Sequence, residues 1–336
     1  MTATLTAPSI MMLADESPAE ELELSLNHRA RLGVLKRRVW GSGSKRDEDV
    51  TQRVNELFDV EQDAGAYSKK IAGNLRSKTL SPSKRALKDI IDIASQAYAF
   101  YKGVTMPWLN NGTRIFASAA YFEIVKKMRD FEDQFAAAVD RFVPLYPDLL
   151  NEVSIEHGKA FKLDEYPSPS QIRQCFSMGF ASFPLPELSQ ENDFRRQLGD
   201  AEVERIQREN QAMYETAMAN AMRDVYRRII ATIGKMAERL RLYEVTPEGT
   251  VHPFRDSTIE NVEELVELLR MLNVTGDSAL DQMTQDISGK LTRYSCDTLR
   301  TSDGIRAKVL KDAETIVREA VEQHDKLAEE VGELLG

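Results

Sequence analysis

The residues able to do chemistry in this 336-residue chain are few and far apart. None of its four histidines stands four residues from another or in an H-E-x-x-H setting, the spacing that would give a helical metal pair. The two cysteines, Cys175 and Cys296, are too distant for a disulfide framework or a metal knuckle. His157 lies near Asp164 and Glu165 and could form part of a metal site, but this interpretation is disfavoured. We therefore expect no catalytic residue, no cofactor and no metal.

One short segment has the composition of a phosphate-binding loop without its spacing. Gly41-Ser-Gly-Ser-Lys45-Arg46 has two glycines one residue apart, whereas a P-loop needs G-x-x-x-x-G-K-[ST]. The acidic residues Asp47, Glu48 and Asp49 follow at once and would repel an anion. A flexible loop is the favoured interpretation.

Charge is distributed unevenly along the chain, although the net charge is −10. The region from Glu244 to Gly336 has 20 acidic and 10 basic residues. From Ala64 to Lys88 there are no acidic residues, and a nucleic-acid surface, head-to-tail self-association and simple solvation all fit this pattern. The seven basic residues of that stretch are the candidate nucleic-acid contacts: Lys69, Lys70, Arg76, Lys78, Lys84, Arg85 and Lys88.

Two segments rich in aromatic residues and proline are candidates for partner docking. The first is the loop around Met106-Pro-Trp108, and the second includes Phe180 and Phe183. Exposed Trp, Phe and Met residues favour protein interfaces. The alternative is that these side chains fill the junction between the N-terminal module and the long helix.

A helical repeat from about Asp200 to Tyr243 is the strongest structural signal. Its apolar or small residues recur every three or four positions, and no proline interrupts it. A helix of this length must pack on partner helices over most of its length, and we expect these to begin near Asp277 and Asp303. The stripe comprises Val203, Ile206, Met213, Ala217, Ala221, Val225, Ile229, Ile233, Met236, Leu240 and Tyr243.

The remaining elements are predicted from shorter patterns. Ser81-Pro82 is a helix start, and that helix should end at Gly103. Short strands are expected within Leu22–Leu26 and Leu32–Trp40, and an edge strand within Phe180–Pro186. Further helices are expected over residues 50–58, 115–146, 171–176 and 257–272, from Asp277 to about Tyr294, and from Asp303 onward.

The expected fold is therefore mainly α. A long-helix antiparallel bundle or coiled-coil hairpin would carry a small α+β N-terminal module. The expected division is a flexible arm over residues 1–20, a mixed module over 21–198, and the long helix with its bundle over 199–336.

Three motifs together resemble a known family. They are Met106-Pro-Trp-Leu-x-x-Gly-Thr-Arg-Ile115 followed by Tyr121-Phe122, then Tyr166-Pro-Ser-Pro-Ser170, and Phe183-Pro-Leu-Pro186 with Asp193-Phe-Arg195. The chain resembles an uncharacterised family of bacteriophage and bacterial proteins, often encoded near AAA+ ATPases of the MoxR or cobaltochelatase type. The resemblance covers roughly Leu22 to Tyr243. It implies an AAA+ ATPase as a partner and carries over no active site.

Three function classes follow from these observations. The first is a non-enzymatic helical scaffold or adaptor, working with an AAA+ ATPase or in a larger phage or bacterial assembly. The second is a DNA-associated accessory factor of replication or recombination, with weak nucleic-acid binding. An enzyme ranks last. We also expect a homo-oligomer, no membrane contact, and a cytoplasmic location, in the host cytoplasm if the gene is phage-encoded.

Overall fold

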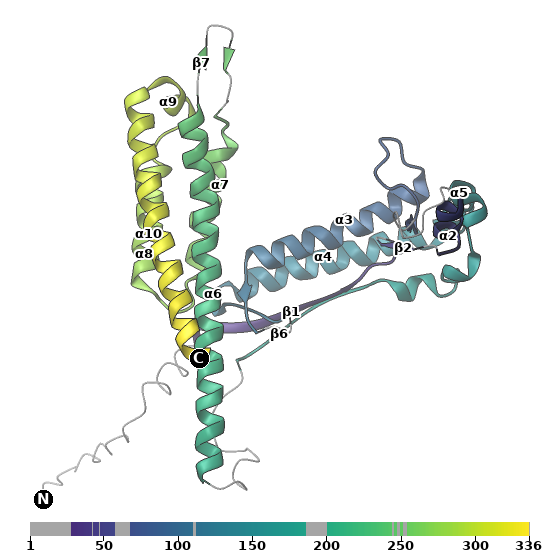
Figure 1. Cartoon of the computed structure of the whole chain (residues 1–336), viewed down its shortest axis with the longest axis horizontal. Coiled ribbons are helices and arrows are strands. Elements are labelled where there is room, and N and C mark those ends of the chain that lie inside the picture. The colour runs from purple at the N-terminus through teal and green to yellow at the C-terminus, as the bar shows by residue number, and fades with distance from the viewer. Residues whose placement is uncertain are drawn as a thin grey trace, which may run out of the picture. The chain divides into compact units, whose positions relative to one another are not determined.

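The computed structural model is mainly helical with a small antiparallel sheet (Figure 1). It describes residues 28–41, 43–46, 48–57, 68–109, 112–185, 200–243, 245–246, 249–250 and 254–335. The expected arm over residues 1–20, the strand within Leu22–Leu26 and the boundary at residue 198 lie outside the described residues. Among the helices that are described, none has the length and apolar character needed to traverse a bilayer.

The chain divides into two compact units built from interleaved segments. The first takes its residues from Met1–Leu32, Met106–Ala119 and Phe183–Gly336, and the second from Gly33–Thr105 and Ala120–Ser182. Each unit has its own cluster of buried apolar side chains. The sequence suggested consecutive segments, whereas the contacts bring together residues far apart in the chain.

The first unit is organised around α6 (Asp200–Leu242), which confirms the predicted long helix. Its main packing partners are α10 (Asp303–Leu335) and α7 (Ser257–Leu272). The predicted stripe is buried from Ala217 to Leu240, but Met213 is 41% exposed. Leu334, close to the end of α10, lines the same groove as Met213, so the described part of α10 ends near this point. Met213 therefore lies beyond most of the cover that α10 was expected to provide.

Shorter elements complete the helical part of this unit. Asp277 caps α8 (Ser278–Asp286) as predicted, because its side chain accepts from the N–H groups of Ala279 and Leu280. The helix predicted to run to about Tyr294 instead continues as a π-helical turn, Ile287–Leu291. That turn includes Gly289, a residue that lowers α-helix stability. A short helix, α9 (Cys296–Thr301), and a hairpin of β7 (Val245–Thr246) and β8 (Gly249–Thr250) were not predicted.

A four-stranded sheet has the order β4-β5-β1-β6. Its strands are β4 (Met106–Pro107), β5 (Arg114–Ala117), β1 (Ala30–Arg38) and β6 (Ser177–Phe183). The predictions of a strand before Trp40 and of an edge strand near Phe180 are confirmed.

The prediction that a helix begins at Ile115 was wrong. Residues 114–117 form β5, in which Ile115 pairs with Met106 of β4. Gly112, with φ of +82°, helps to reverse the chain between the two strands. The helix α4 (Tyr121–Phe142) begins only after a 3₁₀ turn at Ser118–Ala120. The apolar pair Ile115-Phe116 fits either structure, and pairing with β4 selects the strand.

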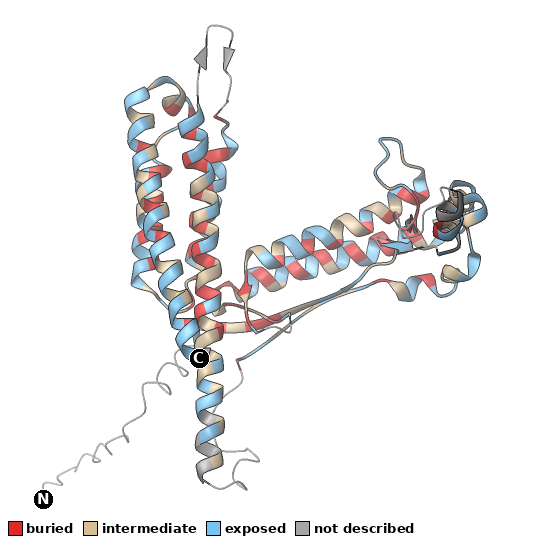
Figure 2. Cartoon of the chain, viewed as in Figure 1, coloured by how far each residue is buried: buried red, intermediate tan, exposed pale blue. Residues whose placement is uncertain are grey.

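The second unit is built around α3 (Pro82–Gly103), which packs on α4. Figure 2 shows the buried residues of these helices along the sides that they turn to each other. The predicted cap is present, because Ser81 Oγ accepts from the Lys84 N–H. The predicted helix near residue 50 is also confirmed, as α2 (Glu48–Leu57).

The remaining elements of this unit are short. They are α5 (Tyr146–His157), β2 (Ser44–Arg46), β3 (Ser68–Lys70), and 3₁₀ turns at Val143–Leu145, Gly158–Ala160, Leu163–Glu165 and Ile172–Cys175.

Burial of α6 can be tested by placing a charge on its packed side. Ile229 is fully buried, whereas Ala231 on the same helix is exposed. We expect Ile229→Asp to lower the free energy of unfolding by about 4 kcal/mol, because an unpaired carboxylate would enter an apolar core. The loss should lower Tm by ~10 °C in thermal unfolding followed by circular dichroism. Ala231→Asp should leave Tm nearly unchanged, and equal effects of the two variants would contradict the packing.

Candidate nucleic-acid interface

Lys69, one of the predicted nucleic-acid contacts, lies inside the second unit. Its side chain has no exposed surface, and Nζ donates to the Ala160 carbonyl at 2.5 Å. The same ammonium forms an ion pair with Glu165 at 2.7 Å, and Lys45 approaches that carboxylate at 3.2 Å. The hydrogen bond from Lys69 lowers the pKa of Glu165, so this carboxyl is held in its charged form. Lys69 therefore holds β3 to the segment that follows α5 and is not placed to contact phosphate.

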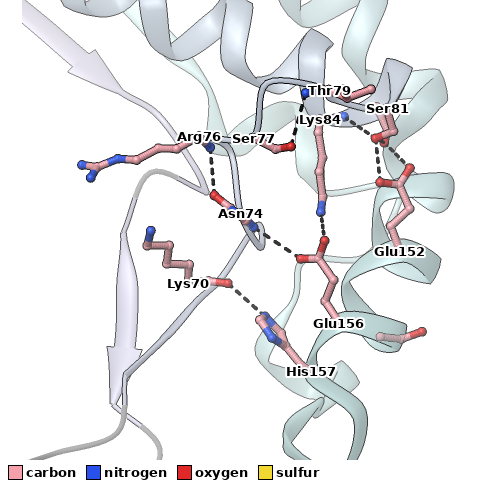
Figure 3. Close-up of polar contacts among 12 residues, drawn as sticks. Lys70, Asn74, Arg76, Ser77, Thr79, Ser81, Lys84, Glu152, Glu156 and His157 are labelled. Atoms are coloured by element: carbon pink, nitrogen blue, oxygen red, sulfur yellow. Dashed lines mark hydrogen bonds and ion pairs between the residues drawn. The ribbon is translucent and has the colours of Figure 1, made fainter.

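Lys84 is also buried and has a structural partner. Its ammonium forms an ion pair with Glu156 of α5, which also accepts from the Asn74 N–H at 3.3 Å (Figure 3). Position 73 favours glycine, because φ is +69° and a Cβ atom there would displace the Glu156 carboxylate. This network fixes the loop before α3 against α5.

A second carboxylate of α5 fixes the start of α3. Glu152 accepts from the hydroxyls of Ser81 and Ser83, each at 2.6 Å (Figure 3). His157 Nε2 lies 2.9 Å from the Lys70 carbonyl, which places this histidine in the same structural network. Three glutamates thus hold the basic segment in place: Glu152, Glu156 and Glu165.

Five of the seven predicted contacts are still able to reach a ligand. The side chains of Lys70, Arg76, Lys78 and Arg85 are exposed, and Figure 3 shows that of Arg76 directed away from the network. Lys88 forms an ion pair with Asp92, and its side chain is 41% exposed. A phosphate would have to compete with Asp92 for Lys88, so the candidate surface consists of four exposed cations and one shared cation.

Three further basic residues lie at the end of β1, and the middle one contacts an exposed aromatic ring. Lys36, Arg37 and Arg38 are all exposed. The Arg37 guanidinium lies 4.1 Å from the centre of the Tyr98 ring, and Lys102 Nζ lies 5.7 Å from the same ring. The Tyr98 ring is 39% exposed. Proteins that bind single-stranded DNA or RNA combine positively charged side chains with aromatic rings in this way.

The predicted docking residues do not all reach the surface. In the first unit, Met106 and Trp108 are buried in the core, and the Trp108 ring packs edge-on against Tyr214 at 5.6 Å. They fill the interior, as the alternative interpretation proposed. In the second unit, Phe180 is half-buried near Tyr101. Phe183 is 38% exposed and is the most accessible of the four.

The described residues contain no group of three or more side chains arranged to hold a metal ion. Burial raises the pKa of the Cys296 thiol to about 12. This thiol is therefore protonated at neutral pH and is a poor nucleophile.

The structural role of Lys69 can be separated from a binding role by comparing it with its neighbour. We expect Lys69→Met to lower the free energy of unfolding by about 3 kcal/mol, because Glu165 and the Ala160 carbonyl lose their buried partner. Lys70→Met removes the same charge from an exposed position and should have little effect on stability. Urea unfolding of both variants tests this difference. Equal stability of the two variants would show that the ion pair contributes nothing.

No protein-family model matches the chain, and neither a curated protein nor a solved structure matches it. The resemblance to a bacteriophage and bacterial family therefore remains a prediction from three motifs.

Proposed function

We propose that the protein is a non-enzymatic helical scaffold or adaptor of phage or bacterial origin. In this proposal α6, α7 and α10 form an antiparallel bundle or coiled-coil hairpin that serves as a rigid arm. The observation that carries the proposal is the division of the chain into two compact units, each with its own apolar core. Two units with different surfaces can engage two different partners.

The charges of the two units support separate binding roles. The first unit has 23 basic and 35 acidic residues, a net charge of −12. The second has 21 basic and 19 acidic residues, a net charge of +2. An acidic surface favours a partner with a basic face and disfavours a polyanion. We therefore assign a protein partner to the first unit, and the resemblance suggests an AAA+ ATPase or a larger assembly containing one.

The adaptor proposal predicts salt-sensitive capture of an ATPase. Tagged full-length protein, used to capture partners from native or infected cells, should enrich a protein with a Walker A motif at about 100 mM salt. The enrichment should fall at about 500 mM salt, because screening weakens contacts between charged surfaces. Adding the purified chain should also change the ATPase rate of that partner. Absence of any such ATPase from the captured proteins, or an ATPase rate that the chain does not alter, would contradict this choice of partner.

The second candidate function is a DNA-associated accessory factor. It is favoured by the exposed basic residues of the second unit and by the Arg37 contact with the Tyr98 ring. Basic side chains bind phosphate groups, and aromatic rings stack on bases. Neither contact depends strongly on the base sequence. The net charge of −10 opposes approach of any polyanion, so binding should be weak.

Charge-reversal variants test whether DNA binds to this surface. In a filter-binding assay at about 50 mM salt, we expect weak, sequence-tolerant retention of DNA that falls steeply with salt. Retention should be lost when Lys70, Arg76 and Arg85 are all replaced by Glu. The matched control replaces Lys308, Lys311 and Lys326, three exposed lysines of α10, by Glu and should retain DNA. Retention that survives the first triple change would move the surface elsewhere, and no retention of single- or double-stranded DNA by the unmodified protein would remove this function.

A further inference from the structure

One side of α6 carries a regular row of residues, of which Glu209, Met213, Asn220 and Arg227 are exposed and the others are partly buried. Positions spaced by three and four residues lie on one side of a helix. The side chains of Glu202, Glu209 and Arg227 are 44%, 61% and 64% exposed. Met213, near the middle of the row, is 41% exposed. The complete row is Glu202, Ile206, Glu209, Met213, Thr216, Asn220, Arg223 and Arg227.

The middle of this row forms the floor of an apolar groove of about 400 Å³. Its other lining includes Leu109, from the turn between β4 and β5, and Leu334, near the end of α10. These leucines are 40% and 36% exposed. Leu109 has φ of +53°, a left-handed conformation that disfavours leucine. A strained backbone that keeps an apolar side chain beside a groove suggests that the side chain has a binding role.

The charges of the row are ordered along the helix. Two acidic residues lie at its beginning, apolar and neutral residues lie in the middle, and two arginines lie at its end. The helix dipole favours Glu202 near the N-terminus, but its effect is confined to the first and last turns. Arg223 and Arg227 lie well before Leu242, where α6 ends, so the dipole does not account for them.

We propose that this face joins two copies of the chain, with the two α6 helices antiparallel and crossing between Met213 and Thr216. In this register every residue of the row faces a complementary or compatible residue of the second copy. The overlap is about 38 Å long at 1.5 Å per residue. The two-fold axis produces each of these pairs twice: Glu202 with Arg227, Ile206 with Arg223, Glu209 with Asn220, and Met213 with Thr216.

Existing ion pairs within α6 do not prevent this association. Arg205 pairs with both Glu202 and Glu209 on an exposed surface. Arg227 lies 3.5 Å from Asp224, whose side chain is 16% exposed and lies closer to Arg228, at 2.8 Å. Exposed pairs of this kind contribute about 0–1 kcal/mol, so they are easily rearranged. The Met213 side chain of each copy would cover the apolar groove of the other. The proposal is independent of the function proposed above, because neither an ATPase nor DNA takes part.

A charge exchange tests both the surface and the register. Sedimentation equilibrium at ~20 µM protein should give a mass near 76 kDa, twice the 38.0 kDa of one chain. Glu202→Arg and Arg227→Glu should each weaken the dimer at least ~10-fold, because each change places like charges opposite one another twice. The double variant restores opposite charges and should recover most of the affinity. Glu263→Arg, at an exposed position of α7, makes the same charge change away from the face and should have no effect.

The groove itself is tested at Leu109. Leu109→Gly removes the backbone strain, so Tm should not fall, yet it also removes one wall of the groove and should weaken the dimer. The proposal is overturned if the unmodified protein stays at 38.0 kDa, or if the double variant is no stronger than either single change. Dimers that are insensitive to both charge changes and to Leu109→Gly would show that a different surface joins the copies.

Discussion

A helix as long as α6 is stable in water only where one of its sides is buried, and this constraint organises the first unit. Val225, Ile229 and Ile233 are completely buried, and each contributes roughly 1.5–3 kcal/mol through removal from water. The helices α7 and α10 provide that cover, and the ion pair between Arg241 and Glu314 lies where α6 and α10 meet near the end of α6. The adaptor proposal depends on this packing, because an arm that presents binding surfaces must be rigid.

The second unit depends on a different interaction, the pairing of lysines with glutamates at the base of α3. Burying Lys69 and Lys84 has a large desolvation cost, which their ion pairs and hydrogen bonds must offset. Removing one partner of such a pair is strongly unfavourable, because the other charge is then left buried without a partner. The same contacts leave other basic residues of this segment exposed, and the proposed DNA surface consists of those residues.

Much of the secondary structure could be predicted because the signals are local. The repeat of α6, the Ser81-Pro82 start of α3 and the Asp277 cap of α8 are all visible within a few residues of sequence. The burial of lysines could not be predicted in this way. Glu156 stands 72 residues from Lys84, and only the folded chain brings the two together.

The sequence was also ambiguous wherever an apolar residue could serve more than one role. Trp108 fits both a docking loop and a core, and its contact with Tyr214 of α6 decides for the core. Tyr98 continues an apolar helical pattern, yet it lies under Arg37 at the surface. The order of charges on α6 can be read in the sequence, but its meaning depends on knowing how far each of these side chains is exposed.

The central claim is that two separately packed cores support the chain, and native-state hydrogen exchange tests it most directly. Amides of α6 between Ala217 and Leu240 should share one opening free energy with the amides of α10 that face them. Amides of α3 and α4 should share a second, different value. Increasing denaturant should therefore expose the two groups at different concentrations. A single opening free energy for all four helices, or fast exchange in the buried part of α6, would contradict the account.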